Sequence, residues 1–146
     1  LGLGARVSLV GALPANIAFT MGKILVMPSR AENLPYVAME AAAAGVPLIA
    51  TQVGGLPEII QGSDTRLVPA DDPEALACAM ALVADDFEAA GKRAERLRSI
   101  VKERFTTTRM VRSTLEFYRD ALLRISAERA PAATPPSEIY CYRENP

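Results

Sequence analysis

Two glutamates flank a predicted helix start and are the residues best suited to chemistry. Glu32 lies in a loop, and Glu40 lies about one turn inside a helix predicted over Pro35–Ala44. An ionised carboxylate offers only hydrogen-bond acceptors, so each acid suits a vicinal diol, which ribose and hexoses both present. The helix start carries unpaired N–H groups and a partial positive charge, which suit a phosphate or diphosphate. One helix start would therefore bind a diphosphate while the two acids bind the sugars on either side of it.

Alternating apolar runs and helical segments must position these residues. Short strands are predicted at Arg6–Val10, Lys23–Met27, Val46–Thr51 and Arg66–Val68. A brief helix or turn is predicted at Pro14–Met21, and helices are predicted at Pro35–Ala44, Leu56–Gln61, Pro73–Val83 and Asp86–Arg104. Thr107 or Thr108 is predicted to cap a final helix that reaches about Arg124. This alternation predicts an α/β fold with a doubly wound parallel sheet. Ligands bind such sheets outside the carboxyl ends of the strands, where the loop with Glu32 is expected.

Glycine and aspartate mark several of the expected turns and helix ends. Gly45 is predicted as a left-handed helix cap, and Asp72 as the cap of the helix that starts at Pro73. Gly54-Gly55 is predicted as a tight turn, for which glycine is favoured with or without a binding role. Glu58 lies in the first turn of a helix, where the helix dipole alone explains an acid.

The composition excludes several classes of function. The 146 residues are 50% hydrophobic and 23% charged, and the formal net charge is −1. This balance indicates a globular domain without the basic field that nucleic acid attracts. Histidine is absent, which removes the commonest general base and the commonest zinc ligand. Acid–base chemistry would have to use carboxylates or come from another domain.

Cysteine usage and the chain ends bear on location and domain organisation. Cys78 and Cys141 show no metal-ligand spacing, and Cys78 is predicted to lie in the core. A distant pair fits a reducing cytosol, and no apolar run approaches the roughly 20 residues that span a bilayer. We expect one domain over residues 1–129, a flexible proline-containing tail over 130–146, and a fragment of a longer protein.

The stretch from Pro28 to Glu58 carries a specific resemblance. It contains Pro28-Ser29 at a strand end, Glu32, Glu40-Ala41 eight residues later, Gly45-Val46-Pro47, and Gly54-Gly55-Leu56-Pro57-Glu58. This pattern resembles the signature of family 4 of the retaining GT-B glycosyltransferases (glycosyltransferase group 1). The similarity extends over roughly Arg6 to Val83, with weaker helical similarity to Arg124. It implies the C-terminal, donor-binding half of a GT-B fold, with strands 3 to 6 and the C-terminal helices present.

The resemblance implies roles for individual residues. Glu40 matches the glutamate that binds the nucleotide ribose, and Glu32 matches the one that contacts the transferred sugar near the reacting carbon. The remaining expected donor-binding residues are Ser29, Asn33, Leu34, Tyr36, Val37, Gly54 and Gly55. The family transfers the sugar with retention and generally without an essential metal. The resemblance therefore implies a retaining hexosyltransferase, with no metal or other cofactor expected.

Some positions depart from the family pattern. Asn33 and Leu34 stand where glycine and an aromatic residue are common, and Asn33 adds a polar side chain near the sugar. Thr65 and Asp71 stand where the family often has glycine. We expect both to lie far from the loop with Glu32, and to affect turn geometry rather than activity.

The implied partners follow from what the family places elsewhere. The family sheet has strand order 3-2-1-4-5-6, so the first two strands and a basic pair upstream are missing here. The expected partners are a nucleotide sugar, a glycan or lipid-linked acceptor, the N-terminal domain of the same enzyme and, through an open sheet edge, a second copy. The expected location is cytoplasmic, with contact to the inner face of a membrane as a weaker possibility, in polysaccharide biosynthesis. A non-catalytic interaction module and a nucleotide-sugar epimerase remain as alternatives.

Overall fold

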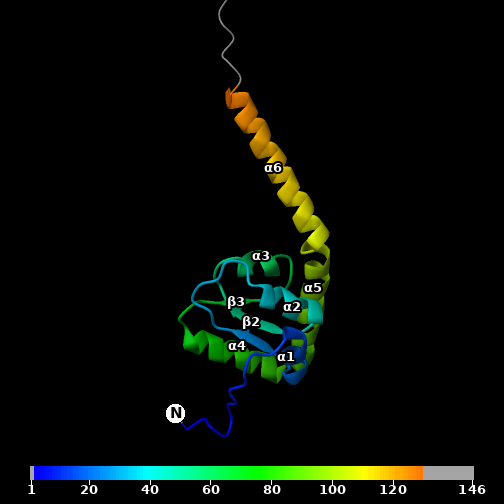
Figure 1. The fold of residues 1–146 in the computed structure, drawn as a ribbon. Coiled ribbons are helices and arrows are strands. Elements are labelled where there is room, and N and C mark those ends of the chain that lie inside the picture. The colour runs from blue at the N-terminus through cyan, green and yellow to red at the C-terminus, as the bar shows by residue number, and fades with distance from the viewer. Residues whose placement is uncertain (1, 130–146) are drawn as a thin grey trace, which may run out of the picture. The chain divides into compact units, whose positions relative to one another are not determined.

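The computed structural model describes residues 2–129, and the chain divides after Thr106 into two compact units (Figure 1). The first unit contains every strand of the described part and five of its helices. The second unit is represented by α6, Thr107–Arg129. Thr107 and Thr108 were predicted as candidate caps but lie inside this helix, which is also longer than expected. The predicted tail over 130–146 lies outside the described residues.

The sheet of the first unit is parallel, as predicted. Its strands are β1 (Leu25–Met27), β2 (Leu48–Thr51) and β3 (Leu67–Val68), in the order β1-β2-β3. Leu25 pairs with Leu48, and Thr51 pairs with Val68. All four residues of β2 are buried, which is typical of a central strand covered on both faces.

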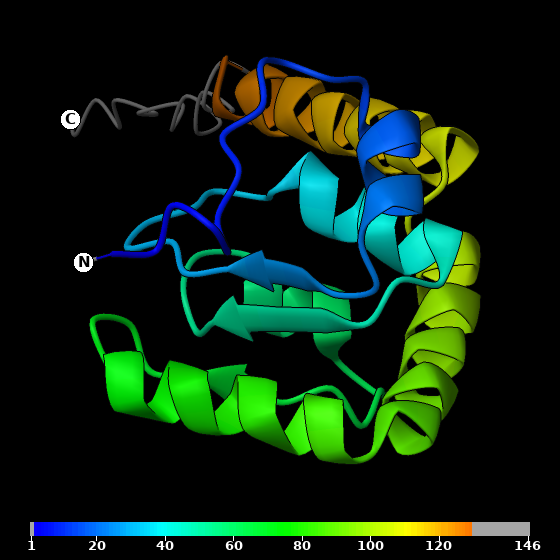
Figure 2. The same cartoon turned by 90° about the horizontal axis from the view of Figure 1, so that it is seen from below.

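Helices cover both faces of this sheet (Figure 2). They are α1 (Ala15–Met21), α2 (Tyr36–Ala44), α3 (Leu56–Ile60), α4 (Pro73–Asp85) and α5 (Phe87–Arg104). The main core joins Leu48 and Ala50 of β2 to side chains of α2, α3 and α5. Successive strand residues face opposite sides, so Ile49 points to the other face, where α4 packs against β2. The doubly wound arrangement is therefore confirmed.

The strand predicted at Arg6–Val10 is wrong. These residues form no strand, and a hydrogen-bonded turn from Leu3 to Val7 occupies part of the segment. Leu9 is 98% exposed and Val10 is 64% exposed. Within residues 2–129, β1 pairs with β2 alone, so the outer edge of β1 is unpaired.

The predicted caps Gly45 and Asp72 are confirmed, and Asp86 caps a further helix. The carboxylate of Asp72 accepts a hydrogen bond from the Ala75 N–H, and that of Asp86 accepts one from Ala89. Gly45 ends α2 at φ 78°, and its N–H bonds back to the carbonyls of Ala41 and Ala42. Left-handed backbone favours glycine, which explains this residue at the helix end.

Two further expectations concern burial. Cys78 is exposed, so its predicted place in the core is wrong. It lies on α4, a helix with no fully buried residue, because only one side of α4 meets the sheet. Cys141 lies outside the described residues. Among the helices of residues 2–129, none has the length and apolar character that a membrane span requires.

Replacement of Gly91 by alanine is expected to stabilise the chain. Gly91 lies inside α5, and a Cβ added there meets no atom within 4 Å. Because alanine loses less backbone entropy in a helix, we expect a gain of about 0.5–1 kcal/mol, measured as a rise in Tm. Gly45→Ala is the control and should lower Tm, because the φ of 78° at this position is unfavourable for any residue with a Cβ. A Tm that falls for Gly91→Ala would contradict the placement of α5.

Candidate functional site

Three loops meet at the carboxyl edge of the sheet. They are the β1–α2 loop (residues 28–35), the β2–α3 loop (52–55) and the β3–α4 loop (69–72). Parallel strands end at the same edge, so these loops are neighbours although they are far apart in the sequence. The predicted site residues all lie in the first two loops or in α2.

The β1–α2 loop holds Glu32 in a defined position. Ser29 Oγ donates a hydrogen bond of 2.7 Å to Glu32 Oε1, and both residues are half-buried. Thr51 lies at the end of β2 and is only 3% exposed. Its hydroxyl donates to the Ser29 carbonyl at 2.6 Å, which ties the start of the loop to the sheet. The Glu32 carboxylate is therefore oriented before any ligand binds.

Gly54 and Gly55 allow the second loop to approach the first. The Gly55 N–H donates to the Asn33 carbonyl at 2.5 Å. A Cβ on Gly54 would lie 2.0 Å from the Glu32 carbonyl oxygen, and Gly54 has φ 51°. A Cβ on Gly55 would lie 2.8 Å from the Asn33 oxygen. Both glycines are thus required by the contact between the loops, whatever ligand binds.

The start of α2 exposes its first two side chains, which follow a buried Pro35. Pro35 precedes the helix and makes no side-chain cap, in contrast to the aspartate caps of α4 and α5. The shorter α1 and α3 also lack a side-chain cap. Tyr36 is 70% exposed and Val37 is 38% exposed. The first N–H groups of α2 can therefore meet an anion at this end of the helix.

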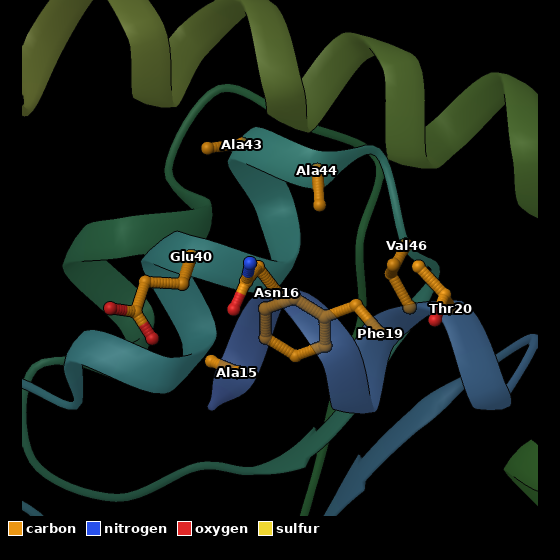
Figure 3. Close-up of a pocket in the computed structure, with 8 residues that line it drawn as sticks. All are labelled: Ala15, Asn16, Phe19, Thr20, Glu40, Ala43, Ala44 and Val46. Carbon is orange, nitrogen blue, oxygen red and sulfur yellow. The ribbon is translucent and has the colours of Figure 1, made fainter. Parts of the chain in front are cut away.

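Glu40 lies on a different side of the site. Its exposed side chain lines a cavity of about 530 Å³ between α1 and α2. Figure 3 shows Glu40 beside Asn16 and Phe19 of α1, at one end of this cavity. The structure thus groups Ser29, Glu32 and Asn33 with the glycine turn, and groups Glu40 with α1. The α1 residues were not predicted, because only the packing of the two helices brings them to Glu40.

Asp71 was predicted to lie far from the β1–α2 loop, and this is wrong. Its carboxylate Oδ1 accepts a hydrogen bond from Arg30 Nε at 2.6 Å. Arg30 immediately follows Ser29 in the β1–α2 loop. The expected effect on turn geometry is present as well, since Asp71 has φ 57°. No local pattern shows a contact between residues 41 positions apart.

Comparison with known proteins shows which family and relatives the chain is similar to. The family model described as "Glycosyl transferases group 1" matches residues 1–86, which include all three loops and α2. The D-inositol 3-phosphate glycosyltransferase of Acidothermus cellulolyticus is 38% identical over 114 residues, covering 76% of this chain and 24% of that protein. The N-acetyl-alpha-D-glucosaminyl L-malate synthase of Bacillus anthracis is 35% identical over 110 residues, covering 73% of this chain and 29% of that protein.

A solved structure shows the same fold. Sucrose-phosphate synthase from Thermosynechococcus elongatus superposes with a TM-score of 0.74 at 31% identity. The match covers 84% of this chain and 32% of that one. The chain therefore spans about a quarter to a third of the length of these relatives.

Proposed function

This chain belongs to the group 1 glycosyl transferases, and on that premise we propose that it is the donor-binding part of a retaining hexosyltransferase. Its donor is a nucleotide-diphosphate sugar, and its acceptor is a glycan or a lipid-linked acceptor. The observation that supports this most is the uncapped, exposed start of α2 directly after a loop that orients Glu32. An electropositive helix start and an oriented acid suit a diphosphate next to a sugar.

The proposed mechanism rests on charge and position. As the glycosidic bond breaks, negative charge develops on the leaving diphosphate, and the N–H groups at the start of α2 stabilise it. Glu32 accepts hydrogen bonds from the transferred sugar near the anomeric carbon, and Glu40 accepts them from the ribose. Both acids hold the donor so that the anomeric carbon faces the acceptor, and the charge of Glu32 also stabilises the positive charge that develops on the sugar. No metal takes part in this scheme.

The rest of the enzyme supplies what this chain does not offer. The acceptor site and further positive charge for the diphosphate are proposed to lie in the remaining length that the relatives have. We expect the isolated chain to bind the donor without transferring its sugar. The open edge of β1 would be covered by that remaining part or, in the isolated chain, by a second copy. The proposed setting is polysaccharide biosynthesis in the cytoplasm.

The direct test uses the natural full-length protein. UDP-glucose, GDP-mannose and UDP-N-acetylglucosamine are offered as donors, and the anomeric configuration of the product is read by NMR. Retained configuration supports the proposal, and inverted configuration or a released epimer contradicts it. Failure of all three donors to bind would favour a non-catalytic module.

Glu32→Gln is expected to reduce turnover more than donor affinity. The amide keeps an oxygen that can accept the Ser29 hydroxyl, so the fold and Tm should not change. The lost negative charge should lower kcat about 10- to 100-fold, because it acts where positive charge develops on the sugar. Steady-state kinetics and calorimetric binding separate the two effects. Glu74→Gln, at the first turn of α4, is the control and should leave kcat unchanged.

A further inference from the structure

An ion pair joins the β1–α2 loop to the β3–α4 loop. Arg30 Nε lies 2.6 Å from Asp71 Oδ1, and the two residues are 41 positions apart. The other anchors of the β1–α2 loop are Thr51, which holds the Ser29 carbonyl, and Gly55, which holds the Asn33 carbonyl. Arg30 lies between these two anchor points, in the segment that carries Glu32. The pair therefore restrains the part of the loop that the backbone anchors leave free.

The backbone at Asp71 shows why the side chain matters. Asp71 is the one non-glycine residue with positive φ in the described part of the chain, at 57°. Glycine adopts this conformation freely, whereas an aspartate must tolerate strain there. What aspartate adds is a carboxylate, and that carboxylate contacts Arg30. The strain at this turn is thus coupled to a contact with the β1–α2 loop.

We infer that Asp71 is a positioning residue for donor binding. Through Arg30 it holds the β1–α2 loop in the geometry in which Glu32 and the start of α2 receive the nucleotide sugar. The identity of the ligand in this inference rests on the proposed function. The restraint on the loop does not depend on it. The pair is exposed, with side chains 84% and 62% accessible, so its effect is modest and is screened by salt.

The chain offers a matched control for this pair. Asp64 forms an exposed ion pair with Arg96 of α5, and its side chain is also 62% accessible. Asp64 lies between α3 and β3, outside the three loops of the site. Asp64→Asn therefore measures how the loss of an exposed aspartate–arginine ion pair outside the site affects affinity and Tm. Asp71→Asn removes the charge but keeps a residue that tolerates positive φ, and Asp71→Gly removes the pair and the strain together.

The first measurement is calorimetric affinity for the best-binding donor among UDP-glucose, GDP-mannose and UDP-N-acetylglucosamine. Asp71→Asn, Asp71→Gly and Arg30→Gln should each weaken binding about 2- to 5-fold at low salt, and less at high salt. The Arg30→Gln/Asp71→Asn double variant should be no weaker than either single one. Asp71→Gly should keep or raise Tm while affinity falls, a combination that a purely structural role does not produce. Asp64→Asn should leave affinity unchanged.

The second measurement needs no donor. Hydrogen exchange of the unliganded chain should be faster at the amides of residues 30–34 in Asp71→Asn than in Asp64→Asn. Unchanged exchange there, or equal loss of affinity in both variants, overturns the inference. Faster exchange without binding of any donor supports the restraint and rejects the proposed function, so the two failures are distinguishable.

Discussion

Glu40→Ala is expected to weaken nucleotide-sugar binding about 10- to 100-fold, because a carboxylate that accepts hydrogen bonds from a diol contributes about 1.5–3 kcal/mol. Glu40 is exposed on α2 and lines the cavity between α1 and α2. Its removal leaves no buried group unpaired, and alanine is the strongest helix former. The loss should therefore appear in affinity with no fall in Tm. Calorimetric titration of the chain with a nucleotide sugar measures it.

The nucleoside part of the ligand provides an internal check on this result. If Glu40 contacts the ribose, the matching nucleoside diphosphate without its sugar should lose affinity by the same factor. Glu32→Gln should leave the affinity for that nucleoside diphosphate unchanged, because Glu32 is assigned to the sugar. Glu103→Ala, an exposed glutamate of α5, controls for charge alone. Equal affinities of Glu40→Ala and the unmodified chain would reject the ribose assignment.

The start of α2 could be predicted because its determinants are local. Pro35 sets the beginning of the helix, Gly45 ends it in left-handed backbone, and the acids lie at fixed distances along the chain. Asp72 as a cap follows from the same short-range chemistry. Each of these features depends on residues within one helical turn, so the sequence alone contains the information.

The contacts between loops could not be predicted, because they depend on how the strands are arranged. Thr51 reads as the last residue of an apolar strand, and only the pairing of β2 with β1 brings its hydroxyl to the Ser29 carbonyl. In the sequence, nothing distinguishes Arg30 and Asp71 from ordinary charged loop residues, and both are exposed in the structure. The restraint that they form exists only in the folded sheet. The geometry of Glu32 thus depends on Thr51, Arg30 and Asp71, which no motif indicates, as well as on the motif residues.

The missing strand at Arg6–Val10 shows a limit of local patterns in parallel sheets. A run with Val7, Leu9 and Val10 has the composition of a strand, but a strand also needs a neighbour that satisfies its N–H and C=O groups. Within residues 2–129 no strand pairs with this segment, and β1, whose outer edge is free, pairs with β2 alone. The apolar side chains of the segment remain exposed as a result.

Gly54→Ala is expected to produce the largest loss of stability among these variants, at about 2–5 kcal/mol. Two separate costs contribute. The φ of 51° is unfavourable for alanine, and the new Cβ would lie 2.0 Å from the Glu32 carbonyl oxygen. That oxygen belongs to the backbone, so it cannot rotate away as a side chain could. Relief requires movement of the β1–α2 loop, which also displaces Glu32 and should abolish measurable donor binding.

Two other glycines separate these costs. Gly62 has φ 88°, but a Cβ there would meet only Ile100 Cδ1 at 3.7 Å, so Gly62→Ala carries the backbone strain without the clash. Gly55 has φ −81°, so Gly55→Ala carries the clash with Asn33 without that strain. We expect Gly62→Ala to lower Tm and leave donor affinity intact, whereas Gly55→Ala lowers both. If Gly54→Ala bound donor as well as Gly62→Ala does, the β1–α2 loop would not need the glycine turn. In that case Ser29 and Thr51 would set the position of Glu32 without help from the glycine turn.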